Sequence, residues 1–456
     1  MTIQLSERRQ ELLTSLREQG VRYLFGAYVD GHGVPKSKCV PIDFLDHMAG
    51  GSELYTVGAL EGMGVLGPNE DECSGIPDLD RMVVLPWDRR YAVAPADLEF
   101  HGAPYSHDSR AVLKRQLAAA AELGYTFNTG VEPEVYVLRN VDGDWRPWVG
   151  EDMYNLPTRG YDLETTMLAD AFLEPMVEHM TALGWEVYSF DHEGGDGQYE
   201  FEFHFTEALE MADRMLLFRL MSKHVARTLG CIATFMPKPF DANFGSGAHV
   251  NMSLADIETG ENRFEGDASS NGHRGYSQLA YWFTAGILRH ARAITAVACP
   301  TVNSYKRLLP VGHMNSITWA PVYQAFGHNN RTLMCRLPMN RRCTELRIAD
   351  SASNFYLVMG LALAAGLEGV REQLDPGEPV NVDTYTVPDA DLAERGVPRL
   401  PRTLGEAVDA FEADELARET FGAEFHTSFV ELKRAEWEGY NTVISQWERE
   451  QYMHLW

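Results

Sequence analysis

Four segments of the chain alternate polar and apolar residues with a period of two. Successive side chains of a strand point to opposite faces, so this period shows which residues share a face. In "VEPEVYVL", Glu132 and Glu134 share one face, and Val131, Val135 and Val137 take the other. The segments "GQYEFEFHF", "GAHVNMSL" and "RCTELRIAD" have the same character. We therefore predict four strands with one apolar face each, whose polar faces carry Glu132, Glu134, Glu200, Glu202, His204, His249, Asn251, Ser253, Glu345 and Arg347.

Apolar residues at helical spacing mark the longer elements. This spacing predicts helices over residues 4–19, 109–124, 163–183, 206–229, 275–296, 352–372 and 423–450. Residues 21–42 are predicted to form a hairpin around the "DGHG" turn, and Asp108 to cap the second helix. Mixed strands and helices indicate an α+β protein, with a small N-terminal domain at 1–105 and a larger domain at 106–456. The proline- and charge-rich residues 374–402 are expected to form a surface excursion.

Acidic residues on otherwise apolar strands need a compensating charge if they are buried. Any one of these strands is also compatible with an edge strand whose polar face is solvated. Four together favour convergent polar faces around cations, because burying an unpaired carboxylate costs several kcal/mol. A set of carboxylates with one imidazole suits Mg²⁺ or Mn²⁺ better than zinc. The predicted ligands are Glu132, Glu134, Glu193, Glu200, His249 and Glu345.

Four arginines near these segments suggest an anionic substrate. They are Arg307, Arg331, Arg336 and Arg347. Guanidinium groups bind carboxylate and phosphate oxygens in pairs, and hard metals held by carboxylates commonly hold phosphate as well. The chain has no G-x-x-x-x-G-K-[ST] motif, so a P-loop enzyme is excluded. The residues alone thus predict metal-dependent phosphoryl transfer from a nucleotide to a small anionic substrate.

The composition narrows the class of protein. The 456 residues are 45% hydrophobic, which is ample for a packed core, and the formal net charge is −27. That charge argues against nucleic acid and anionic membranes as partners. The six cysteines form no metal or disulfide pattern, and the N-terminus does not resemble a signal peptide. We expect a cytoplasmic enzyme.

Eight motifs in order resemble the glutamine synthetase family across nearly the whole chain. They are "VEPEVYVL", "HEGGDGQYEFEF", "FMPKPF", "GSGAHVNMSL", "NSYKRLLP", "NNRTLMCRLP", "TELRIADSASNFYL" and "AAGLEGV". The resemblance implies an N-terminal β-grasp domain and a catalytic domain with a curved, mainly antiparallel sheet flanked by helices. It also implies stacked rings, usually a dodecamer, with each active site between neighbouring subunits. In this family ATP phosphorylates the γ-carboxylate of glutamate, and an amine then attacks the γ-glutamyl phosphate.

The resemblance also assigns roles to individual residues. It implies two or three Mg²⁺ or Mn²⁺ ions per site, one held by Glu134, Glu193 and Glu200 near glutamate. Another, held by Glu132, His249 and Glu345, would orient the ATP phosphates. Glutamate would be bound by Gly245 and Arg307, and the transferring phosphoryl group faced by Arg331 and Arg347. The nucleotide side would carry Asn251, Ser253 and Arg336.

The departures from the family pattern concern the amine. The segment "LPVGHMNSITWAP" has no acid and carries Trp319 where the family flap ends in a glutamate. The N-terminal loop reads "LEGMG", with Glu61 in place of the family aspartate and no serine, and Cys343 replaces an arginine. A more apolar pocket favours an alkylammonium. The segment "TWAPVYQAFGHNNRT" most resembles members that use methylamine. Glu61 is the candidate base for the amine proton, with His313 and Tyr161 as weaker candidates.

Three alternatives stay open from the sequence. The first is an ammonia-dependent glutamine synthetase, and the second is a ligase for ethylamine, ethanolamine or a polyamine. The third is a non-catalytic homologue, which the complete ligand set argues against. Adenylylation at Tyr385 is not favoured, because its surroundings differ from those of regulated members.

Overall fold

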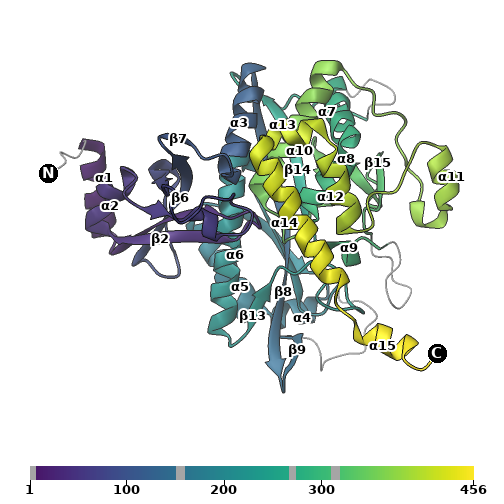
Figure 1. The fold of residues 1–456 in the computed structure, drawn as a ribbon, viewed down its shortest axis with the longest axis horizontal. Coiled ribbons are helices and arrows are strands. Elements are labelled where there is room, and N and C mark those ends of the chain that lie inside the picture. Colours follow the sequence, from purple (N-terminus) through teal and green to yellow (C-terminus); the bar gives the residue numbers. More distant parts are fainter. Residues whose placement is uncertain (1–6, 150–159, 267–273, 310–318) are drawn as a thin grey trace.

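The computed structural model describes residues 7–149, 160–266, 274–309 and 319–456 (Figure 1). His313 therefore lies outside the described residues. Two sheets organise the chain, one built from the N-terminal residues and one from the remainder. In Figure 1 the first lies to the left and the larger, helix-covered part to the right.

The N-terminal sheet has seven strands in the order β2-β1-β6-β4-β3, with β5 and β7 also paired to β6. The predicted hairpin is present, since Val29 at the end of β1 pairs with Pro35 at the start of β2. β1 runs parallel to β6, and α1 and α2 complete this part. The elements are α1 (Glu7–Glu18), β1 (Tyr23–Val29), β2 (Pro35–Pro41), α2 (Leu45–Ala49), β3 (Leu54–Tyr55), β4 (Cys73–Pro77), β5 (Val83–Val84), β6 (Tyr91–Phe100) and β7 (Ala103–Pro104).

The larger sheet has ten strands in the order β10-β11-β8-β14-β17-β16-β15, with β9, β12 and β13 also paired to β8. All of its pairs are antiparallel except β15 with β16. The strands are β8 (Tyr125–Val141), β9 (Asp144–Pro147), β10 (Val187–His192), β11 (Gln198–Phe203), β12 (Thr206–Glu207), β13 (Ile232–Thr234), β14 (Ala248–Asp256), β15 (Tyr323–His328), β16 (Leu333–Leu337) and β17 (Thr344–Leu346).

Helices flank this sheet. They are α3 (Ser109–Glu122), α4 (Leu163–Leu168), α5 (Asp170–Ala182), α6 (Ala208–Thr228), α7 (Gln278–Arg289), α8 (Ala291–Ala298), α9 (Ser304–Arg307), α10 (Phe355–Glu372), α11 (Asp389–Glu394), α12 (Leu404–Glu412), α13 (Glu415–Phe421), α14 (Ala423–Asn441) and α15 (Gln446–Tyr452). α10 is buried along most of its length and packs on α3 and α7. A Cβ on Gly286 would lie 1.9 Å from the Ala365 carbonyl oxygen, so glycine permits this close approach of α7 to α10.

Three predicted helices are each divided in two. The prediction of one helix over 423–450 is wrong, because α14 ends at Asn441 and α15 starts after Ser445. Ser445 and Glu448 form a capping box, which starts a new helix where the periodic pattern predicts continuity. The predicted helices at 163–183 and 275–296 are likewise divided, at Ala169 and His290.

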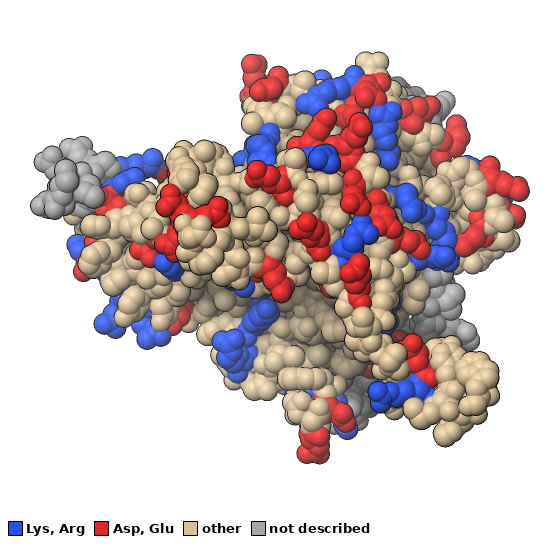
Figure 2. Space-filling model, in the orientation of Figure 1, with Lys and Arg blue, Asp and Glu red and all other residues tan. Residues whose placement is uncertain are grey.

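The surface carries mixed charge. Figure 2 shows acidic and basic side chains interspersed over the C-terminal helices on the face drawn. α15 has no buried residue and extends away from the body in Figure 1. In the described part of the chain, no helix combines the length and the apolar character needed to cross a membrane.

Candidate active site

Four neighbouring strands present five of the six predicted metal ligands at matching positions. The register pairs His249 on β14 with Glu132 on β8, and Asn251 with Glu345 on β17. On the other side of β8, Glu134 pairs with Glu200 on β11. The strand period thus brings carboxylates from three strands to one face around His249.

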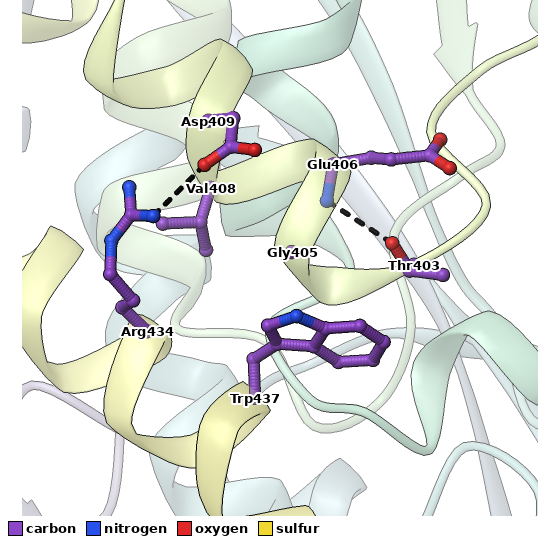
Figure 3. A pocket seen from close by; sticks show the side chains of 7 residues that line it. All are labelled: Thr403, Gly405, Glu406, Val408, Asp409, Arg434 and Trp437. Atoms are coloured by element: carbon purple, nitrogen blue, oxygen red, sulfur yellow. Dashed lines mark hydrogen bonds and ion pairs between the residues drawn. The ribbon is translucent and has the colours of Figure 1, made fainter. Parts of the chain in front are cut away.

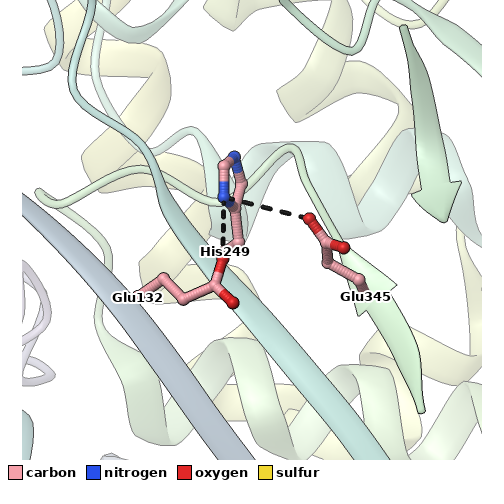
Figure 4. A group of neighbouring side chains, drawn as sticks. All are labelled: Glu132, His249 and Glu345. Carbon is pink, nitrogen blue, oxygen red and sulfur yellow. Dashed lines mark hydrogen bonds and ion pairs between the residues drawn. The ribbon is translucent and has the colours of Figure 1, made fainter. Parts of the chain in front are cut away.

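The first group of possible ligands is Glu132, His249 and Glu345, whose ligand atoms lie within 4.8 Å of one another. Figure 4 shows the three side chains pointing toward each other from β8, β14 and β17. The His249 Nδ1 lies 3.3 Å from Glu132 Oε2 and 3.9 Å from Glu345 Oε1. Burial and the charge of Arg347 lower the pKa of His249, which keeps the imidazole neutral and able to bind a cation.

The second group is Glu134, Glu200 and His249. Glu134 Oε2 accepts hydrogen bonds from Gln198 Nε2 at 2.7 Å and from the Gly247 backbone N–H at 2.8 Å. Burial and the charge of Glu193 nevertheless raise the pKa of Glu134 to about 8. Burial and the charges of Glu193, Glu134 and Glu132 raise the pKa of Glu200 well above its usual range. A bound divalent cation would supply a positive charge that opposes both shifts.

Asp191 joins the third group, with Glu193 and Glu200. It lies on β10 directly opposite Glu200 in the register, and the sequence prediction did not include it. Burial, then the charges of Glu193 and Glu202, raise the pKa of Asp191 to about 6. The alternation in "YSFDHE" was the available signal, since Asp191 and Glu193 are two residues apart. The carboxylate-rich donor set fits Mg²⁺ or Mn²⁺.

Guanidinium groups neutralise the opposite end of this face. Glu345 is fully buried and accepts from Arg336 at 2.7 Å and from Arg347. Burial acts to raise the pKa of Glu345, but Arg347, His249 and Arg336 together hold this pKa below its usual value. Arg341, which the sequence prediction missed, donates to Glu132 Oε1 at 2.5 Å. One side of the site, at Glu134 and Glu200, is therefore rich in carboxyl groups. On the other side, arginines balance the charge of Glu345.

Comparisons with known proteins agree with this geometry. Residues 106–452 match the glutamine synthetase catalytic domain. The chain belongs to the glutamine synthetase family. Glutamate–methylamine ligase of Methyloversatilis universalis is 38% identical over 441 residues, covering 96% of this chain and 98% of that protein. Glutamine synthetase of Rhizobium leguminosarum bv. phaseoli is 34% identical over 454 residues, covering 98% and 99%.

Solved structures agree as well. A GmaS–ADP complex superposes with a TM-score of 0.88 at 35% identity, covering 97% of this chain and 99% of that one. GmaS without ligand superposes with a TM-score of 0.87 at 34% identity, covering 97% and 99%. These matches confirm the predicted fold class.

Arg307 and Gly245 lie together beside this glutamine synthetase-type cluster. The Arg307 guanidinium donates to the backbone carbonyls of Ile348 and Arg347 at 2.9 Å and 3.0 Å. A Cβ on Gly245 would lie 2.6 Å from Arg307 Cγ, so a larger residue would displace this arginine. Ser253 lies further along β14, opposite Asn128 in the register.

Trp319 and Tyr161 are both exposed to solvent. The Arg331 guanidinium stacks over the Trp319 ring at 5.0 Å from its centroid. Tyr161 is 71% exposed, and its backbone N–H donates to the His192 carbonyl at 2.8 Å. Burial of its hydroxyl and the charge of Glu193 raise the pKa of Tyr161, which relates this tyrosine to the carboxylate cluster.

Glu61 occupies a different part of the chain. Its carboxylate lies 3.2 Å from His32 Nε2, and its side chain is 81% exposed. Within the described ranges, no hydrogen bond or ion pair joins Glu61 to the carboxylate cluster. The structure of one chain therefore does not bring this predicted base to the metal ligands.

One surface cavity has no relation to this chemistry. It has a volume of about 270 Å³ and lies between α12 and α14 (Figure 3). Its polar groups pair with one another, because Arg434 donates to Asp409 at 3.0 Å and Thr403 Oγ1 accepts from the Glu406 N–H at 3.1 Å. None of the predicted ligands lines it.

Proposed function

We propose that this protein is an ATP-dependent ligase that joins the γ-carboxylate of L-glutamate to a small alkylamine, with methylamine favoured. The observation that carries the proposal is the 38% identity to a glutamate–methylamine ligase over 96% of this chain. The acid-free segment with Trp319 in place of the family glutamate supports it independently. The products are the γ-glutamyl alkylamide, ADP and phosphate.

Mg²⁺ or Mn²⁺ would neutralise the phosphate charge and orient the γ-phosphoryl group when bound. Glu134, Glu193 and Glu200 would hold the ion near glutamate, and Asp191 is placed to join them. Glu132, His249 and Glu345 would hold the ion near the ATP phosphates. This division is supported by the grouping of the glutamates, since Glu132 and Glu345 fall in one group of neighbouring ligand atoms and Glu134 and Glu200 in another.

The side chains then act in two steps. A γ-carboxylate oxygen of glutamate attacks the γ-phosphorus of ATP, and ADP leaves. Arg307 and Gly245 hold glutamate, while Arg331 and Arg347 balance the charge of the transferring group. The amine nitrogen next attacks the carbonyl carbon of γ-glutamyl phosphate, and phosphate leaves. Glu61 takes the proton from the amine.

We propose that Glu61 completes the site of a neighbouring subunit in a dodecamer of two stacked rings. The separation of Glu61 from the cluster within one chain supports a shared site.

The nucleotide would be faced by Asn251, Ser253 and Arg336. Arg341 would supply the positive charge that Cys343 lacks, since Arg341 already donates to Glu132. Tyr161 would border glutamate.

We further propose two domains, at residues 1–105 and 106–456, and a cytoplasmic location. The two separate sheets support the division into domains.

An amine panel tests the proposal. ADP release is measured at saturating ATP and glutamate with methylamine, ethylamine, ethanolamine and ammonia. We expect methylamine to give the highest kcat/KM, because burial of one methyl group contributes about 0.8 kcal/mol, or roughly fourfold. A higher kcat/KM for ammonia would instead assign the protein as a glutamine synthetase.

Metal removal gives a second test. We expect EDTA to abolish ADP release in the presence of glutamate and methylamine, and Mg²⁺ or Mn²⁺ to restore it. ADP release that persists in excess chelator would contradict the metal assignment.

A further inference from the structure

A row of four polar side chains leads from Glu61 into the C-terminal part of the chain. Glu61 Oε2 lies 3.2 Å from His32 Nε2. The other ring nitrogen, His32 Nδ1, lies 3.3 Å from Lys433 Nζ, which in turn donates to Glu436 Oε2 at 3.2 Å. The row therefore links the "LEGMG" loop, the "DGHG" turn and α14.

Burial changes sharply along this row. The Glu61 side chain is 81% exposed and the His32 side chain 32%. Both line a cavity of about 540 Å³. The Lys433 side chain is only 1% exposed, and burial lowers its pKa against the opposing effect of Glu436. The outer end of the row is therefore accessible to a substrate, while the inner end is fixed.

Two members of the row, His32 and Glu436, are held by backbone hydrogen bonds. The carboxylate of Asp30 accepts a hydrogen bond from the His32 backbone N–H at 3.0 Å, which fixes the turn. Glu436 Oε1 accepts from the Val302 N–H at 3.0 Å, shortly before α9 and Arg307. The row thus joins the loop that carries the proposed base to the segment before Arg307, which is proposed to bind the substrate glutamate.

The direction of the hydrogen bonds follows from the chemistry of the groups. A lysine ammonium only donates, so His32 Nδ1 accepts from Lys433. A neutral imidazole carries its proton on one nitrogen, so Nε2–H donates to the Glu61 carboxylate. Lys433 thereby keeps His32 in the tautomer that orients Glu61.

We propose that His32 and Lys433 are positioning residues for the amine base. His32 orients the Glu61 carboxylate through its Nε2–H, and Lys433 fixes the tautomer of His32. The alkylammonium gives one proton to Glu61, and its nitrogen lone pair then attacks the carbonyl carbon of γ-glutamyl phosphate. The C–O bond to phosphate breaks, and the second N–H proton leaves with the phosphate. The inference rests on the proposed function, in which Glu61 is the base.

A double-mutant cycle tests this assignment. In assembled enzyme, Glu61→Gln is expected to lower kcat/KM for methylamine roughly 100-fold and His32→Ala roughly tenfold. In the Glu61→Gln background, His32→Ala should cause no further loss, because the group it orients is absent. His32→Gln should recover part of the activity, since its amide N–H can donate to the carboxylate. Lys433→Met should act in the same direction and have no further effect in the His32→Ala background.

Hydroxylamine separates positioning from general damage. It is mainly neutral at assay pH and needs no base to become a nucleophile. We expect the rate with hydroxylamine and the KM values for ATP and glutamate to be unchanged in His32→Ala. His101→Asn is the matched control, because His101 forms an exposed pair with Asp71 at 2.7 Å elsewhere in the N-terminal part; it should leave all rates unchanged.

Two results would overturn the proposal. They are an equal loss with methylamine and hydroxylamine, or a His32→Ala loss that persists in full in the Glu61→Gln background. If wild-type enzyme prefers ammonia, the proposed amine fails, but the cycle is then measured with ammonia, which also arrives protonated. The two failures are therefore distinguishable.

Discussion

At the scale of single residues, the site depends on close backbone approach as much as on ligands. Gly247 donates its N–H to Glu134, and a Cβ there would lie 2.9 Å from Glu134 Oε1 and 3.1 Å from the Arg307 Nη2. The pair Glu134 and Arg307 is thus set by a residue that carries no functional group.

Gly247→Ala tests this constraint. We expect kcat/KM for glutamate to fall roughly tenfold or more, because the methyl group displaces both side chains from their working positions. Steady-state kinetics and thermal unfolding measure the effect. Gly260→Ala is a control for the added methyl group, since nothing lies within 4 Å of a Cβ there, although its φ is +73°. A normal kcat/KM in Gly247→Ala would contradict the constraint.

The raised pKa of Glu134 predicts a pH effect on stability. Burial and Glu193 raise this pKa to about 8, whereas an unfolded chain titrates near about 4.3. Between these values the folded state binds more protons, so the free energy of unfolding of metal-free protein falls as pH rises. We expect the Tm of chelator-treated protein to fall between about pH 5 and about pH 8. The Tm of Glu134→Gln should fall less steeply over this range. An identical slope in the two proteins would refute the raised pKa of Glu134.

At the scale of elements, Asp108 connects α3 to strand β6 of the N-terminal sheet. It caps α3 by accepting from the Arg110 N–H at 2.9 Å, and its other oxygen accepts from the Leu98 N–H of β6 at 3.0 Å. Burial raises the pKa of Asp108 to about 6. The cap predicted from the sequence therefore also fixes the start of α3 against the N-terminal sheet.

Asp108→Ala should leave two buried donors without partners. We expect a loss of about 2 kcal/mol of unfolding free energy, measured as a lower denaturation midpoint. Ser445→Ala removes the same kind of cap from the exposed α15 and should change the midpoint little. Equal shifts in the two variants would contradict a specific role for Asp108.

At the scale of the whole molecule, α15 and the residues after it expose large apolar side chains. Trp447 is 60% exposed, Leu455 62% and Trp456 95%. Apolar side chains gathered in this way on an extended segment commonly mark a protein interface. This agrees with the proposed dodecamer.

Removing residues 445–456 tests that role. We expect the truncated protein to have a lower mass in light scattering than the full chain, because the exposed apolar surface is then absent. Ser445→Ala, which keeps these side chains, serves as the control. An unchanged mass would show that other surfaces hold the assembly together.

The sequence alone determined the ligand-bearing strands, the hairpin, the α3 cap and the family. Each depends on local periodicity or on motifs, which are properties of neighbouring residues. The division of the last predicted helix was missed because the apolar period continues across Thr442–Ile444 while the capping box starts a new helix.

Only the tertiary structure decided which side chains meet. Asp191 is opposite Glu200 because β10 pairs with β11, and Arg341 reaches Glu132 from a loop 209 positions away. The row from Glu61 to Glu436 likewise joins three segments that no local pattern connects. Strand order and loop placement follow from burial of the whole core, and therefore cannot be read from any single segment.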